Sequence, residues 1–168
     1  MTAARYLAAF AALGLVFFTA TASARSLRYP QSGDPAFSME VPEDWSSRTD
    51  NSGNFIVVSG DRAIAYSMNV FVVRASADEV ARNALEVRKV TPVPEKQRVS
   101  ISGSEGVAYK WKASNATNAK LDITLMVVQV DATHVANCTE ILVESGSPEA
   151  HQIAKWFVQD LQISRPAH

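Results

Sequence analysis

The sequence predicts an α+β domain in which an antiparallel sheet of about six to seven strands is covered by helices. Three observations lead to this class. Short apolar runs with alternating polarity follow one another along the chain, which is typical of neighbouring antiparallel strands. Two segments have amphipathic helical periodicity and their own capping residues. The order is three strands, a helix, four strands and a helix, which excludes the regular strand–helix alternation of a doubly wound fold.

The first 24 residues are predicted to be a cleaved signal peptide. Arg5 and the free amine give a positive start, residues 7–18 are uninterrupted and apolar, and residues 22–24 read Ala-Ser-Ala, a small-residue cleavage motif. At about 1.5 Å per residue the apolar run covers about 18 Å, too short for a membrane core of about 30 Å. We expect cleavage after Ala24, which leaves a periplasmic or secreted product without a membrane span.

Residues 25–36 are expected to form a flexible arm in front of the folded part of the chain. The segment contains Pro30, Gly33 and Pro35 and shows no hydrophobic periodicity, so nothing in it favours a helix or a strand. The remaining residues 37–168 contain no internal repeat or low-complexity tract. They are therefore expected to fold as a single domain.

Three strands are predicted at the start of this domain. Residues 37–41 alternate between apolar and polar side chains and stop at Pro42, which predicts a half-buried strand. Residues 55–58 and 65–73 are apolar and rich in strand-forming residues, and the turn at residues 60–62 predicts that they form a hairpin. The second of these runs is apolar at both parities, so we expect a central strand covered on part of both faces.

Two helices and four further strands complete the predicted domain. Ser76 and Glu79 have the spacing of a capping box, which predicts a helix that begins at this point. The apolar stripe of this helix consists of Val80, Ala81, Ala84, Leu85 and Val87. The four strands that follow are predicted over residues 98–102, 107–112, 121–130 and 134–143. The second helix is expected to begin at Ser147, with Pro148 at its first position.

The sequence lacks the familiar catalytic and cofactor-binding motifs. It contains no glycine-rich phosphate loop and no G-x-S-x-G nucleophile motif. Its 16 basic and 17 acidic residues exclude a strongly basic protein that binds nucleic acid through phosphate contacts. We therefore expect a non-enzymatic protein without a cofactor and without a nucleic-acid partner.

His134 and Cys138 are the nearest approach to a pair of metal ligands. On a strand the two side chains would share one face but lie about 13 Å apart, which is too far for one ion. Cys138 is the single cysteine, so it has no disulfide partner in the chain and is expected to be a small buried residue. His151 is expected to be a solvated helix residue. We expect no metal site.

The candidate contact surface lies mainly on one predicted strand, in which aromatic and lysine side chains alternate. Tyr109 and Trp111 are expected on one face, and Lys110 and Lys112 on the other. One interpretation is a core face and a solvated face. The other is an outward aromatic pair, or a two-lysine patch that binds an anionic partner, with Trp45 at the same rim. The candidate contact residues are Trp45, Tyr109, Lys110, Trp111 and Lys112, with no catalytic or metal residue among them.

Residues 37–45, with the sequence FSMEVPEDW, resemble the F-x-x-x-x-P-x-x-W motif that opens PsbP-like and DcrB-like proteins. The order of elements is similar as well: a hairpin, a capped helix, a glycine-centred turn before an aromatic strand, a long hairpin and a C-terminal helix, over about residues 37–163. The resemblance implies an α/β/α sandwich and a non-enzymatic role in a small exported protein. The chain lacks an N-terminal lipoprotein cysteine and a plastid transit segment, so neither a lipid anchor nor a photosystem role is carried over.

Different functional hypotheses remain open at this point. The first is an exported, non-enzymatic domain that binds a protein or an envelope component. The second is a small-ligand-binding protein, with a lipid or metabolite in an apolar pocket between sheet and helix, or an unrecognised hydrolase that uses such a pocket. Because ligand pockets are lined mainly by apolar and aromatic groups, composition does not distinguish these hypotheses. A structural, oligomer-forming envelope protein is the third, and the sequence leaves the oligomeric state open.

Overall fold

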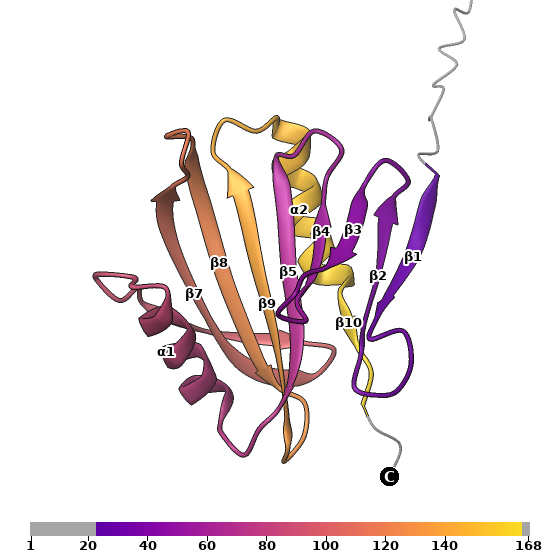
Figure 1. Cartoon of the computed structure of the whole chain (residues 1–168), viewed down its shortest axis with the longest axis vertical. Helices are drawn as coiled ribbons and strands as arrows, with labels where there is room; N and C mark the ends of the chain where they lie inside the picture. The colour runs from indigo at the N-terminus through magenta and orange to yellow at the C-terminus, as the bar shows by residue number, and fades with distance from the viewer. Residues whose placement is uncertain (1–22, 166–168) are drawn as a thin grey trace, which may run out of the picture.

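The computed structural model describes residues 23–165, which contain ten strands and two helices (Figure 1). The elements are β1 (Ala24–Tyr29), β2 (Phe37–Pro42), β3 (Ser46–Thr49), β4 (Phe55–Val58), β5 (Ile64–Val72), α1 (Ala77–Val87), β6 (Lys96–Ile101), β7 (Ser104–Ser114), β8 (Lys120–Gln129), β9 (His134–Val143), α2 (Pro148–Asp160) and β10 (Gln162–Ile163). Seven strands form an antiparallel sheet in the order β3-β4-β5-β9-β8-β7-β6, and β1-β2-β10 form a second, smaller sheet.

The two helices lie on opposite faces of the seven-stranded sheet (Figure 1). On one face, Ala81 and Leu85 of α1 pack in a buried cluster with Leu125 and Val127 of β8. On the other face, α2 and the small sheet pack in a larger cluster. This arrangement is the α/β/α sandwich that the resemblance implies, and it confirms the predicted α+β class with its sheet of six to seven strands. No helix within residues 23–165 is long and apolar enough to cross a membrane.

Both helices begin where their capping residues predict. The Ser76 hydroxyl accepts a hydrogen bond from the Glu79 backbone N–H at 3.3 Å, and the Glu79 carboxylate accepts one from the Ser76 backbone N–H at 2.8 Å. At the second helix, the Ser147 hydroxyl accepts from the Ala150 backbone N–H at 3.1 Å, and Pro148 occupies the first turn. These local bonds satisfy backbone N–H groups that have no partner inside a helix.

The expected flexible arm over residues 25–36 is corrected by the structure, which places its first part in strand β1. This strand pairs along its whole length with β2, from Ala24 opposite Pro42 to Tyr29 opposite Phe37. The Tyr29 ring also stacks on Phe55, with 4.9 Å between the ring centroids. The first part of the segment is ordered by its pairing with the neighbouring strand β2 and shows no hydrophobic periodicity of its own. Pairing of this kind is therefore difficult to predict from the local sequence.

The predicted signal peptide lies outside the described residues, apart from its last two. The Ser23 carbonyl accepts a hydrogen bond from the Glu43 backbone N–H at 3.1 Å, and Ala24 opens β1. Arg25, the first residue after the predicted cleavage point, donates from its guanidinium to the Trp45 carbonyl. Cleavage after Ala24 would therefore leave five residues of β1, with an anchored side chain at their start.

The seven-stranded sheet is bent at the β6 end, where β6 runs across the ends of other strands (Figure 1). Gly106 of β7 is paired with Val128 of β8 and lies close to the β8 backbone. A Cβ atom at Gly106 would lie 1.9 Å from the carbonyl oxygen of Val127. Real Cβ atoms do not approach a carbonyl this closely, so the position requires glycine.

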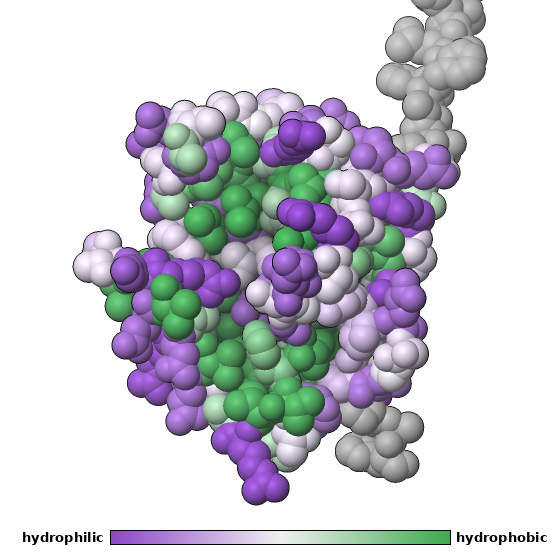
Figure 2. Space-filling model, viewed as in Figure 1, coloured by the Kyte–Doolittle hydropathy of each residue, from purple (hydrophilic) through white to green (hydrophobic). Residues whose placement is uncertain are grey.

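Part of the sheet face that carries α1 is left uncovered by that helix. A row of half-buried apolar side chains crosses β5, β9, β8 and β7 in register, and it consists of Ala65, Ile141, Ile123 and Trp111. Figure 2 shows hydrophobic surface over the upper parts of the strands, beyond the helix. This face is distinct from the face that carries α2.

A candidate binding cleft between the sheet and helix α2

Two of the aromatic residues predicted to form a contact surface lie in the core. Trp45 is only 4% exposed, and its ring stacks with Tyr66 and Phe157 at centroid distances of 6.2 and 6.1 Å. Tyr109 is buried in the cluster beneath α1, together with Leu85. The contact-surface hypothesis is therefore corrected for both residues, because packing of α2 and α1 over the two sheet faces encloses their rings.

The other three predicted residues keep the alternation of β7. Trp111 is half-buried on the α1 side of the sheet, next to the cluster around Tyr109. Lys110 and Lys112 project from the other face, toward α2, and both are exposed. The ammonium group of Lys112 lies 3.4 Å from the Asp122 carboxylate. The side chains of the two lysines thus project from the face of β7 opposite Tyr109, and they lie at a cleft whose lining also includes Trp111.

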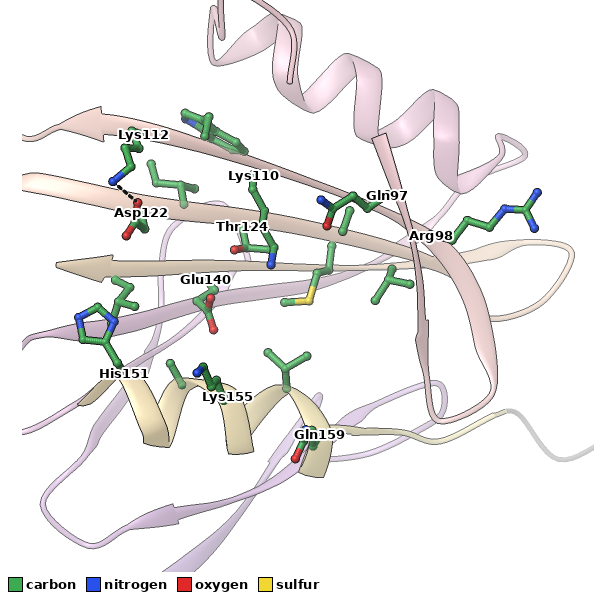
Figure 3. Close-up of a pocket in the computed structure, with 18 residues that line it drawn as sticks. Gln97, Arg98, Lys110, Lys112, Asp122, Thr124, Glu140, His151, Lys155 and Gln159 are labelled. Atoms are coloured by element: carbon green, nitrogen blue, oxygen red, sulfur yellow. Dashed lines mark ion pairs between the residues drawn. The ribbon is translucent and has the colours of Figure 1, made fainter. Parts of the chain in front are cut away.

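This cleft has a volume of about 710 Å³ and lies between α2 and the face formed by β6 to β9 (Figure 3). Ligand sites typically have volumes of about 300–1,000 Å³. The apolar residues that line it come from both walls and are Val99, Ala108, Trp111, Ile123, Met126, Leu142, Ala154 and Val158. Polar side chains on the strands are Lys110, Lys112, Asp122, Thr124 and Glu140. The helix adds His151, Lys155 and Gln159, while Gln97 and Arg98 come from β6.

Strand register explains why polar groups gather in the middle of the cleft. Lys110 on β7 is paired with Thr124 on β8, Thr124 with Glu140 on β9, and Glu140 with Tyr66 on β5. These four side chains therefore form one row across four strands. Two residues along each strand, a second row on the same face is uncharged and consists of Ala108, Met126, Cys138 and Met68. Of these two adjacent rows, Lys110, Thr124 and Glu140 of the polar row and Ala108 and Met126 of the apolar row line the cleft.

Glu140 is the unusual member of the polar row because its carboxyl is largely removed from water. Burial raises the pKa of Glu140, while hydrogen bonds from Tyr66 and Thr124 and the nearby charge of Lys110 act in the opposite direction. The Tyr66 hydroxyl donates to the Glu140 carboxylate at 3.1 Å. Burial, together with the charge of Glu140, also raises the pKa of Tyr66, so Tyr66 remains a neutral donor.

We expect Glu140→Gln to remove part of the pH dependence of stability. Because the folded-state pKa of Glu140 is raised, the folded protein holds this proton to higher pH than the unfolded chain does. The stabilising contribution is complete below the unfolded pKa of about 4.3 and is lost as the pH rises through the folded pKa. Denaturant unfolding at a series of pH values should therefore show wild-type stability, relative to Glu140→Gln, falling as pH rises.

The matched control for this experiment is Glu105→Gln, which neutralises an exposed carboxylate on β7 outside the cleft. Its stability difference from the wild type is expected to change much less between acid and neutral pH. A wild-type advantage over Glu140→Gln that grows with pH would contradict the assignment, because it would mean that the folded protein prefers the ionised carboxylate.

The residues considered as metal ligands do not come together. Cys138 is buried, as predicted, and burial raises the pKa of its thiol. His134 lies at the β8–β9 turn, where its Nδ1 atom is 2.8 Å from the Asp131 carboxylate. Within the described part of the chain, no group of three or more His, Cys, Asp or Glu side chains is placed to hold a metal ion.

Sequence reasoning missed the cleft residues outside β7. Glu140 carried a usable signal, because it falls at the same parity as Ala136, Cys138 and Leu142 in an otherwise apolar strand face. His151 was expected to be solvated, whereas it is half-buried in the cleft wall. The position of α2 over the sheet determines its surroundings, and helical periodicity alone does not give that position.

Comparison with known proteins gives the fold. No protein-family model matches this chain, and no curated protein sequence matches it. Among solved structures it is similar to the cyanobacterial PsbP (CyanoP) of Synechocystis sp. PCC 6803, with a TM-score of 0.58 and 9% identity over 94% of this chain and 99% of that chain. It is also similar to LpqN of Mycobacterium tuberculosis, described as involved in cell envelope biogenesis, with a TM-score of 0.55 and 12% identity over 84% and 91% of the two chains.

A third similar structure is a protein from Bacteroides thetaiotaomicron VPI-5482, with a TM-score of 0.54 and 18% identity. The match covers 77% of this chain but 45% of that chain, so this protein spans less than half of its length. Sequence identities this low establish a similarity of fold and not of function. The chain therefore has a PsbP-like fold, as the motif at residues 37–45 and the order of elements implied.

Proposed function

We propose that this protein is an exported, non-enzymatic domain of the cell envelope that binds an envelope component through the cleft between α2 and the sheet. The main support for this proposal is the cleft, because it combines an apolar lining with charged side chains from both walls. Its charged lining consists of Arg98, Lys110, Lys112 and Lys155 against Asp122 and Glu140. The cleft is therefore positive in a chain whose net charge is −1, which favours an anionic partner.

The described residues of the cleft lack the serine and cysteine nucleophiles of the familiar hydrolases. Cys138 lies in the adjacent row but is fully buried, and its raised pKa keeps the thiol protonated and unreactive. His151 forms no side-chain hydrogen bond to a hydroxyl group within residues 23–165, so the described part of the cleft contains no Ser–His or Cys–His pair.

Two further lines of support concern location. The fold is similar to that of LpqN, a protein described as involved in cell envelope biogenesis. The charged start, apolar run and Ala-Ser-Ala motif at the N-terminus are typical of a signal peptide cleaved after Ala24. Under this proposal the processed chain begins at Arg25 and acts in the periplasm or outside the cell.

A photo-crosslinking side chain at Gln159 tests the proposed function. Gln159 lies on α2 at the cleft and is exposed, whereas Asn83 is exposed on α1 at the opposite face of the sheet. Irradiation of cells that export the full chain should give a specific adduct from position 159 and none from position 83. Mass spectrometry then identifies the attached component. The same adducts at both positions, or no adduct at position 159, would contradict binding through the cleft.

A further inference from the structure

The geometry points to a single-chain amphiphile with an anionic head group as the ligand of the cleft. We infer that the head lies between Lys110 and Lys155 and that the alkyl chain extends toward β6. This inference rests on the proposed function and names the chemical class of the bound component.

The apolar half of the cleft lies on the β6 side of Lys110. Register places Ala108 and Met126 in the row next to Lys110 and Thr124, on the same face of the sheet. Ala154 and Val158 of α2 face this region from the other wall. The alanines on the two walls leave room for a chain, and the flexible Met126 side chain can adjust to its shape. The strand that carries Gln97 and Arg98 crosses this end of the cleft (Figure 3).

Three cations of the cleft lining, Arg98, Lys110 and Lys155, form no ion pair with any residue between 23 and 165. Lys112, by contrast, is held by Asp122 and by Glu144, at 3.4 and 2.5 Å. The Arg98 side chain, on β6, points away from α2 (Figure 3). Lys110 and Lys155 remain, and they lie on opposite walls, one on β7 and the other on α2 (Figure 3). Two unpaired ammonium groups on facing walls favour a ligand that brings its own negative charge.

The acidic residues of the cleft do not offer an equivalent site for a cation. Asp122 is paired with Lys112 at 3.4 Å. Glu140 accepts a hydrogen bond from the Tyr66 hydroxyl at 3.1 Å and lies near the charge of Lys110. Asp122 is thus compensated within the protein, and burial, by raising the pKa of Glu140, disfavours the charged form of that carboxyl. The row of Ala108 and Met126 follows the row of Lys110 and Glu140 on the β6 side, while Asp122 lies in the row on the other side. This order gives the direction of an amphiphile: head at the polar rows, chain toward β6.

Alkyl phosphates of 8, 10 and 12 carbons, each below its micelle concentration, test this inference. Isothermal titration with the purified processed chain should show one site, with affinity rising roughly fourfold for each added methylene that becomes buried. Lys110→Gln should weaken binding of dodecyl phosphate roughly tenfold, as expected for loss of a hydrogen bond to a charged group. Arg74→Gln, which removes an exposed positive charge outside the cleft, should change affinity by less than about twofold.

Four results would overturn the inference. The first is an absence of binding by all three alkyl phosphates, and the second is binding that does not depend on chain length. The third is equal binding of dodecyltrimethylammonium, and the fourth is binding only to vesicles of a two-chain anionic lipid. None of these would decide the proposed function, which the crosslink at Gln159 tests separately. A specific protein adduct at that position, with no amphiphile binding, would retain the binding domain and reject the ligand class.

Discussion

Trp45→Ala is expected to lower the free energy of unfolding by about 3–5 kcal/mol, the range for truncation of a large buried aromatic side chain. The Trp45 ring is 4% exposed and stacks with both Tyr66 and Phe157, so its removal opens a cavity between the sheet and α2. Chemical denaturation followed by far-ultraviolet circular dichroism measures the loss. Trp45→Phe, which keeps an aromatic ring, should lose less and provides a folded variant if Trp45→Ala does not fold.

Trp156→Ala is the matched control, because the same substitution is made on the outer face of α2. Trp156 is 59% exposed, so its removal should change the free energy of unfolding by less than about 0.5 kcal/mol. Equal losses at Trp45 and Trp156 would mean that Trp45 is not the core residue that the structure shows. The contact-surface hypothesis for Trp45 would then be restored.

Gly106→Ala is expected to cost about 2–3 kcal/mol, at the upper end of the range for inserting atoms into a packed region. The added Cβ would lie 1.9 Å from the Val127 carbonyl oxygen and 2.6 Å from the Val128 Cα atom. Both neighbours are backbone atoms of β8, so relief requires the paired strands β7 and β8 to shift. The midpoint of denaturation should fall, and the thermal transition with it.

Gly60→Ala provides the comparison at a second crowded glycine. A Cβ atom at Gly60 would lie 2.2 Å from a carboxylate oxygen of Asp44, but that atom is the end of a flexible side chain that can rotate away. We expect a loss of less than about 1 kcal/mol at this position. A loss at Gly106 no larger than the loss at Gly60 would show that β7 and β8 adjust more easily than their register implies.

The parts of the fold that the sequence predicted are those with local signals. The helix starts follow from Ser76 and Ser147, whose side chains bond within their own first turns. The long hairpin of β8 and β9 follows from two apolar runs and a short turn. The strands β1, β3 and β10 were not predicted, because they are short or aperiodic and are ordered by their partners rather than by their own sequence.

The site was predicted in one respect only. Alternation in β7 placed Lys110 and Lys112 together on one face, and the structure confirms that placement. The positions of the remaining cleft residues depend on contacts between distant segments. Glu140 lies in the same row as Lys110 because of the register of β7, β8 and β9. Lys155 lies at the cleft because α2 packs over this face of the sheet. Trp45 was predicted as a contact residue but lies in the core. The sequence does not distinguish the two, since an aromatic side chain after a turn is equally compatible with a core position and with a surface position.

The order β1-β2-β10 in the small sheet has a consequence for how the protein reaches its native state. One edge of β2 pairs with a strand from the immediately preceding segment, while the other edge pairs Ser38 with Gln162, about 120 residues further along the chain. Contacts of such wide sequence separation slow folding, because a long loop must close before they form. A chain that emerges N-terminus first therefore exposes one edge of β2 until residues 162–163 have been made. The small sheet closes only after β10 has been synthesised.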